Sequence, residues 1–234
     1  MKKTTVITIA ALAASSTFAM ADFEANYVGL TGAGTVHINN GGLIDQDFAA
    51  GHLEFAYTNS MADGGERGAG QFESGSFNTF CIELQNVRNG ARVYDVTNIS
   101  DGPNPSPGAG GPAYDAADQA EVHAIIAAAI RLGWINGDLS AASATNHQLA
   151  GIQGQIWVAV LDNSVVTGNG QVGTEMLALQ AEIAMDPTAG VAGLRAMLNA
   201  DSQDQLFIVP LPTAAFAGLM TLGGLAGFSR IRRR

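Results

Sequence analysis

The spacing of apolar residues changes near the middle of this 234-residue chain, and that change limits the folds open to it. Over residues 22–100, apolar and polar residues alternate in segments such as "GTVHI" and "ARVYDVTNI", which are rich in β-branched and aromatic residues. This alternation predicts the strands of a barrel or sandwich. Over residues 114–200, apolar residues recur three and four positions apart, which predicts helices. A Pro- and Gly-rich stretch at 101–113 separates the two patterns.

A run of strands followed by a run of helices indicates an α+β fold, with a β-rich half (22–100) and a helical half (114–200) sharing one core. The first helix is expected to begin at Asp115 or Asp118, either of which can cap it, and to end near Gly133. Further helices are expected at 147–163, 174–185 and 189–200, and a last strand at about 205–209.

The first 21 residues have the layout of a secretory signal peptide. Lys2 and Lys3 precede an apolar run over 6–14, and small residues at Ala19 and Ala21 mark a cleavage site. We expect cleavage between Ala21 and Asp22, so that the exported body spans 22–208.

The C-terminal tail, 209–234, combines a proline motif, an uncharged stretch and a basic cluster. Residues 213–228 carry no charge and predict a C-terminal transmembrane helix as part of the architecture, with an amphipathic or buried terminal helix as the alternative. The flanking motif is Val209, Pro210, Leu211 and Pro212, and the basic cluster is Arg230, Arg232, Arg233 and Arg234. This order resembles the Val-Pro-Leu-Pro variant of the PEP-CTERM sorting signals. The resemblance implies export, processing by an exosortase-type membrane protease, and a host that makes extracellular polysaccharide.

The exported body is acidic and contains no lysine. Five arginines stand against twenty-one acidic residues between 22 and 208, which leaves sixteen net negative charges. This sign disfavours nucleic acid as a partner.

Two residues of the body do not fit their surroundings. Gln153 lies within the apolar stripe of its expected helix, where a buried amide must find hydrogen-bond partners. Cys81 is the only cysteine, so it cannot form an internal disulfide, and it lies in the middle of an expected strand. Taken singly, Cys81 reads as a small hydrophobe and Gln153 as an amide that caps a buried carbonyl.

Together, these two residues resemble the paired motifs of the thioester domains of bacterial surface adhesins, often called TQxA domains. The matching segments are Phe80-Cys81-Ile82-Glu83 and Gln153-Gly154-Gln155-Ile156-Trp157. Ile152 and Gln155 stand where that family commonly has Thr and Ala. The resemblance implies an internal Cys81–Gln153 thioester, a transferable acyl group, and an acceptor amine from a protein lysine or an amino sugar. The absence of lysine from the body then reflects either protection from self-crosslinking or a saline habitat.

Two other functions are open to this sequence. A passive surface or matrix protein would need the same sorting signals and no chemistry. A Cys-His hydrolase would use Cys81 with His123 or His147, although catalytic cysteines usually lie at helix starts or in electropositive sites. The four histidines have no metal-ligand spacing, and no cofactor motif is present, so no metal and no cofactor are expected.

Overall fold

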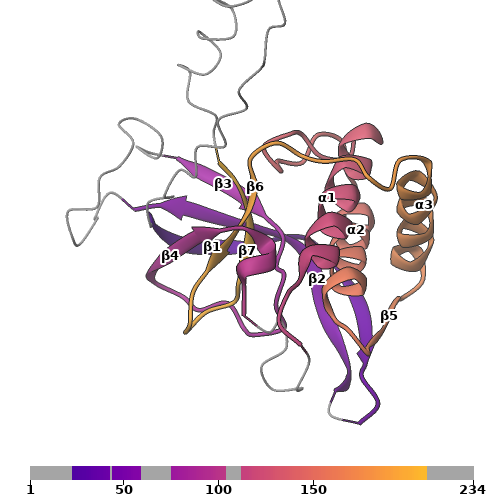
Figure 1. Cartoon of the computed structure of the whole chain (residues 1–234), viewed down its shortest axis with the longest axis horizontal. Coiled ribbons are helices and arrows are strands. Elements are labelled where there is room, and N and C mark those ends of the chain that lie inside the picture. The colour runs from indigo at the N-terminus through magenta and orange to yellow at the C-terminus, as the bar shows by residue number, and fades with distance from the viewer. Residues whose placement is uncertain (1–22, 43, 59–74, 104–111, 210–234) are drawn as a thin grey trace, which may run out of the picture.

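The computed structural model describes residues 23–42, 44–58, 75–103 and 112–209 (Figure 1). Its strands are β1 (Phe23–Asn39), β2 (Asp45–Tyr57), β3 (Ser76–Thr79), β4 (Ala91–Thr97), β5 (Val165–Gly168), β6 (Leu194–Leu198) and β7 (Gln205–Ile208). Its α-helices are α1 (Ala116–Arg131), α2 (Asn146–Val160) and α3 (Gln171–Met185), and a short 3-10 turn, η1, covers Ile99–Asp101.

The strands form one antiparallel sheet that curves into a barrel-like shape. Its order is β3-β2-β1-β4-β6-β7, and β5 pairs with β1 outside this path. Beyond the end of β3, the chain runs beside β7: Leu206 N donates to Phe80 O at 2.8 Å and Ile82 N donates to Asp204 O at 3.0 Å. These bonds join the two ends of the strand order.

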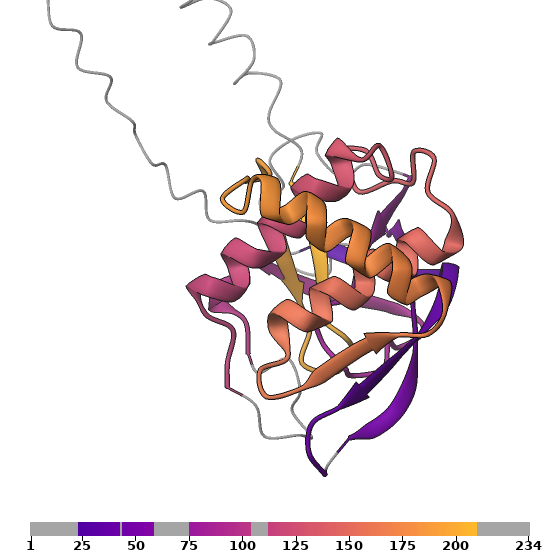
Figure 2. The same cartoon turned by 90° about the vertical axis from the view of Figure 1, so that its right-hand side faces the viewer.

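The three α-helices lie together on one side of the sheet (Figures 1 and 2). Helix α2 packs on β1 and β2, and α1 and α3 both pack on α2. The apolar stripe of α2 therefore meets the sheet, and its Leu149, Ile152, Ile156 and Trp157 are buried. This packing fixes where the side chains of α2 lie relative to the strands.

Local sequence explains where the helices begin. The Asp115 carboxylate caps α1, and the Asp118 carboxylate accepts a hydrogen bond from Asp115 N, so both expected capping residues take part. Thr145 and Gln148 form the same reciprocal arrangement at the start of α2. Helix α3 ends at Met185, immediately before Asp186 and Pro187, as a following proline predicts.

The expected succession of a β-rich half and a helical half is wrong. Three of the seven strands, β5, β6 and β7, follow the second helix in the chain, and β6 and β7 complete the sheet beside β4. The segment 189–200, expected to be a helix, instead contains β6. Gly193 precedes this strand at a φ of +77°, and a Cβ there would lie 2.7 Å from Val209 O, so glycine permits the close approach of β6 and β7.

The expected architecture also included a C-terminal transmembrane helix. Among the residues that the structure describes, no helix has the length and apolar character needed to cross a membrane. The fold is therefore corrected to a barrel-like sheet with three helices on one side. The stretch 213–228 lies outside the described residues, as do the expected signal peptide over 1–21, the rest of the tail after Val209 and the basic cluster.

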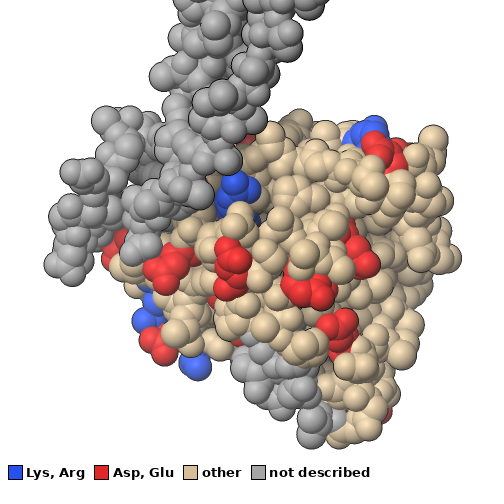
Figure 3. All heavy atoms as spheres, in the orientation of Figure 1, with Lys and Arg blue, Asp and Glu red and all other residues tan. Residues whose placement is uncertain are grey.

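The surface carries scattered acidic side chains and few basic ones. On the face shown in Figure 3, acidic residues are spread over several elements and are not gathered into one patch. One arginine is paired: Arg131 of α1 donates to the Glu182 carboxylate of α3 at 2.6 Å. This distribution reflects the low number of basic residues in the sequence.

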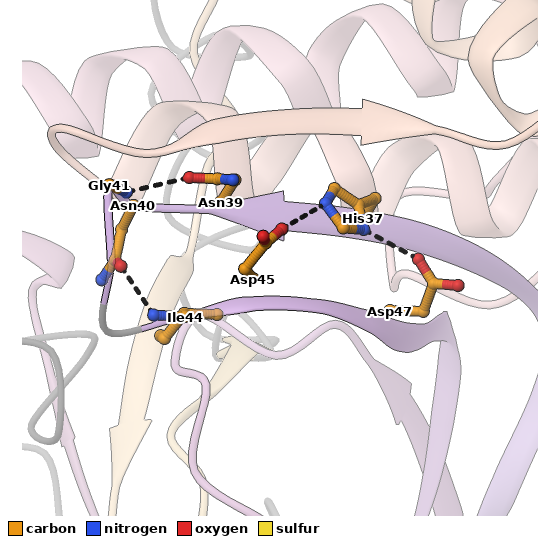
Figure 4. Close-up of polar contacts among 7 residues, drawn as sticks. All are labelled: His37, Asn39, Asn40, Gly41, Ile44, Asp45 and Asp47. Carbon is orange, nitrogen blue, oxygen red and sulfur yellow. Dashed lines mark hydrogen bonds and ion pairs between the residues drawn. The ribbon is translucent and has the colours of Figure 1, made fainter.

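The β1–β2 hairpin holds a histidine between two carboxylates (Figure 4). His37 Nε2 lies 2.9 Å from Asp45 Oδ1, and His37 Nδ1 lies 3.0 Å from Asp47 Oδ1. The hydrogen bond with Asp47, supported by Asp45, raises the pKa of His37, although partial burial opposes this. The charged imidazolium is favoured, since both ring nitrogens then donate.

We expect this contact to make the hairpin less stable as the pH rises. A raised folded-state pKa stabilises the fold fully below the unfolded value of about 6.5, and the stabilisation is lost as the pH rises through the folded pKa. Thermal unfolding of the wild type and of His37→Gln should therefore differ more at about pH 5.5 than at about pH 8.5. His147→Gln, at an exposed position, is the control. A difference that does not change with pH would contradict the assignment.

Candidate functional site

The site lies just after β3, where the chain stops pairing with β2 and continues beside β7. Strand β3 pairs with β2 as far as Thr79, which lies opposite Leu53. Cys81 then forms an isolated antiparallel bridge with Gln205. The two backbone bonds of this bridge come from the residues on either side, so Cys81 and Gln205 are a non-hydrogen-bonded pair. The N–H and C=O of Cys81 consequently point away from β7.

Gln153 of α2 fills the position that a neighbouring strand would occupy. Its Oε1 accepts from Cys81 N at 2.9 Å, and its Nε2 donates to Cys81 O at 2.7 Å. The side chain is fully buried, with an exposed fraction of 0%. The carboxamide thus satisfies both backbone groups of Cys81 and has both of its own groups satisfied, which explains why a glutamine can lie in an apolar helix face.

This arrangement places the Gln153 carboxamide carbon beside the cysteine. The carbon is one C=O bond from Oε1, so it lies within about 4 Å of the Cys81 nitrogen. The two hydrogen bonds come from one planar group and fix its orientation as well as its position. Cysteine and glutamine, 72 positions apart in the chain, are therefore held in contact by a strand segment and a helix packed together.

The Cys81 thiol is buried and uncharged. Burial raises the pKa of Cys81 well above its usual range, and the Glu83 carboxylate raises it further, while a backbone hydrogen bond and the Trp157 indole lower it in part. At neutral pH the sulfur therefore carries its proton. Trp157 Nε1 itself is buried without a hydrogen bond of good geometry, so its contact with the sulfur is looser than a formed bond.

The other motif residues are buried as well. The Phe80 ring lies 4.9 Å from the buried His52 ring, and the Trp157 ring lies 6.0 Å from the Phe48 ring. Ile156 is fully buried. Glu83 Oε2 accepts from Asp204 N at 2.9 Å; burial raises the pKa of this carboxyl, and that hydrogen bond lowers it in part. With Cys81 itself only 4% exposed, the contact is shielded from bulk water.

Three residues of the surroundings were not foreseen from the sequence. Gln205 lies opposite Cys81, the Tyr114 hydroxyl donates to Ile82 O, and Gln203 Nε2 donates to Glu83 O at 2.8 Å. A strand was expected at 205–209, but nothing in its local pattern indicates which strand it pairs with. The sequence feature that could have pointed to these residues is the polar run at 201–205 directly before the apolar residues of β7. In the structure most of this run is buried.

The structure does not bring a histidine to Cys81 within the described ranges. His123 Nδ1 accepts from Val191 N at 3.1 Å, and burial lowers the pKa of His123. His52 Nε2 donates to Leu139 O at 2.7 Å, and His147 is exposed. The same described part of the chain holds no group of three or more potential metal ligands.

Fold and site together define a barrel-like domain with three helices on one side of its sheet and a buried cysteine–glutamine contact. The chain matches no family model, no curated protein and no solved structure. Its function is therefore inferred from the site and from the sequence signals at the two ends.

Proposed function

We propose that this chain is an exported cell-surface or extracellular-matrix protein that attaches covalently to amines through an internal thioester between Cys81 and Gln153. One observation carries the proposal: the Gln153 carboxamide is fixed by two hydrogen bonds against the residue that bears the only thiol. The resemblance of both segments to thioester-domain motifs supports the same assignment.

The crosslinking reaction needs no external reagent. The Cys81 sulfur attacks the Gln153 carboxamide carbon, the C–S bond forms and the C–N bond breaks. The thiol proton leaves with the departing nitrogen as ammonia. Amides are poor electrophiles, so the reaction depends on holding the two groups at near contact, where effective molarities are high. Burial of both residues protects the product from hydrolysis.

The thioester then serves as an acyl donor to an amine. The amine nitrogen bonds to the former carboxamide carbon, the C–S bond breaks, and the amine proton passes to the sulfur. A protein lysine or an amino sugar of a matrix polysaccharide has the required chemistry. Because Cys81 is almost fully buried, transfer requires the residues that cover it to move aside. The body has no lysine side chain that could compete as an acceptor.

Export and sorting are part of the same proposal. The signal peptide over 1–21 directs the chain out of the cytoplasm, and the tail from Val209 onward is a substrate for an exosortase-type membrane protease. An adhesin has to reach the cell surface or the matrix to meet its acceptor, so the signals at both ends and the proposed chemistry of the body agree.

Intact mass tests the thioester directly. The purified protein is expected to weigh one ammonia less than its sequence requires, and Cys81→Ala is expected to recover the full mass for its sequence. Methylamine should add to Gln153 and release one thiol. A wild-type protein of full mass, whose thiol reacts completely in denaturant without methylamine, would refute the thioester.

The same contact also favours a second candidate, a passive surface or matrix protein. Both polar groups of the Gln153 amide are already satisfied by Cys81, so the pair is also complete as packing. In that case the sorting signals keep their role, the mass is that of the sequence, and methylamine leaves the protein unchanged.

A further inference from the structure

The turn that connects β6 to β7, residues 199–204, closes one side of the cysteine site. At its end, Asp204 O accepts a hydrogen bond from Ile82 N at 3.0 Å. The next residue, Gln205, lies opposite Cys81, and the side chains of such a pair project from the same face of the sheet. Displacement of the turn would therefore break a backbone bond next to Cys81 and move Gln205 away from it.

Two buried carboxyl groups meet where this turn contacts the segment after Cys81. Glu83 is 5% exposed and Asp204 is 1% exposed. Glu83 Oε2 accepts from Asp204 N at 2.9 Å, and Asp204 Oδ1 accepts from Asn199 N, at the other end of the turn, at 2.9 Å. The second oxygen, Asp204 Oδ2, is buried and has no hydrogen-bond partner among the described residues. Ionisation of Asp204 would leave this charged oxygen without a donor, which is costly in a buried position.

The groups that face Asp204 do not compensate its charge. Burial raises the pKa of Asp204 to about 7, its backbone hydrogen bond lowers the value in part, and the Glu83 carboxylate raises it further. Tyr94 of β4 and Tyr114, just before α1, also face this carboxyl. Burial raises the pKa of both phenols and Asp204 adds to the rise, so both are uncharged near neutral pH. Arg92, the basic residue of β4, acts on Tyr94 and not on Asp204.

Closure of the turn is therefore linked to the binding of one proton. In the closed turn, Asp204 keeps its proton up to about pH 7, whereas in an open and hydrated turn its pKa returns toward the ordinary value of about 3.9. Opening releases the proton between these two values. The stabilisation of the closed turn is complete below about pH 4, declines as the pH rises, and is lost above about pH 7.

We propose that residues 199–204 form a proton-controlled cover of the Cys81 site: the cover is closed while Asp204 is protonated, and ionisation of Asp204 favours its opening. As a regulator of acyl transfer this cover rests on the proposed function, since its opening would admit the acceptor amine. Mildly acidic surroundings then protect the crosslink. Neutral or basic surroundings expose it and also give the amine more of its reactive free base.

Hydrogen exchange of one backbone amide tests the cover without any crosslink chemistry. Ile82 N donates to Asp204 O, so its exchange requires the turn to open. After correction for the intrinsic rate, its protection in the full-length protein is expected to fall on the order of tenfold per pH unit between about pH 5 and 7, and to level off above. Asp204→Asn keeps an acceptor oxygen for Asn199 N and cannot ionise, so its protection is expected to stay constant.

Asp201→Asn is the matched control, because it makes the same change at an exposed position of the same turn. This variant should retain the pH dependence of wild type. Equal pH dependence in wild type and Asp204→Asn would overturn the inference. So would protection of Ile82 equal to that of amides in the middle of α1 at every pH, since the opening would then be global unfolding.

A titration of the wild type keeps the test decisive if Asp204→Asn does not fold. The carboxyl carbon resonance of Asp204, followed by nuclear magnetic resonance, is expected to titrate with a midpoint near pH 7. A midpoint at the ordinary value of about 3.9 would overturn the inference, because the closed turn would then hold no extra proton.

Methylamine addition separates the cover from the thioester. If wild type carries the crosslink, its rate of addition per free amine should rise over the same pH range and stay constant in Asp204→Asn. Rates with equal pH dependence in the two proteins would show that the cover does not regulate transfer. If wild type has the full mass of its sequence, the proposed function fails, and hydrogen exchange still decides whether Asp204 controls the cover.

Discussion

Gln153→Leu in a Cys81→Ala background is expected to lower the free energy of unfolding by about 2–5 kcal/mol. The alanine background prevents crosslinking and keeps the backbone N–H and C=O at position 81. Gln153 is the partner of both groups, at 2.9 and 2.7 Å, and leucine leaves both buried and unsatisfied. Urea unfolding followed by circular dichroism measures the difference.

Two further variants in the same background sharpen this prediction. Gln155→Leu removes one hydrogen bond, to Met176 O, from another buried position of α2, so a smaller loss is expected. Gln153→Glu retains an acceptor for the N–H at position 81 but opposes its carbonyl with a second oxygen. Protonation of the introduced carboxyl restores a donor, so this variant should gain stability relative to its background as the pH falls. A loss for Gln153→Leu no larger than for Gln155→Leu would show that the paired hydrogen bonds do not stabilise the fold.

The contact between Cys81 and Gln153 shows which information the sequence carries. Helical periodicity places Gln153 in the buried stripe, and the need for hydrogen bonds implies a partner, but neither principle identifies it. The partner was suggested by the resemblance of two motifs. The structure adds a reason that the motifs do not state: Cys81 lies just beyond the end of β3, where its outward-facing backbone groups have no strand beside them.

Long-range strand pairing limited the rest of the prediction. The capping residues of α1 and the breaking proline after α3 act locally, so those helix ends could be read from the sequence. Strand β6 could not, because its conformation depends on β4 and β7, which lie on either side of it in the sheet. Gln205 was missed for the same reason. Its importance comes from the strand it faces, 124 positions earlier, and not from its neighbours in the chain.

The second large effect is expected from a single methyl group on β1. Gly34 lies where β1 passes beneath two helices, and a Cβ at this position would lie 2.7 Å from Ala150 Cβ and 2.7 Å from Val172 Cγ2. Ala150 Cβ is attached directly to the backbone of α2 and cannot move away without moving that helix, and Val172 Cγ2 of α3 can move only by a rotamer change in a buried position. Gly34→Ala is therefore expected to cost about 2–3 kcal/mol and to lower the Tm by roughly 5–10 °C.

Gly29→Ala is the matched control, since it makes the same change on the same strand at a position with no neighbouring atom within 4 Å of the added Cβ. It is expected to be neutral or to stabilise by up to about 1 kcal/mol, because alanine restricts the unfolded chain. Ala150 precedes Gln153 by less than one turn of α2, so a helix displaced by Gly34→Ala carries the carboxamide away from Cys81. We therefore expect the fraction of protein that lacks one ammonia to fall in Gly34→Ala and to stay at the wild-type value in Gly29→Ala. Equal Tm values for the two variants would show that α2 does not depend on this close approach to β1.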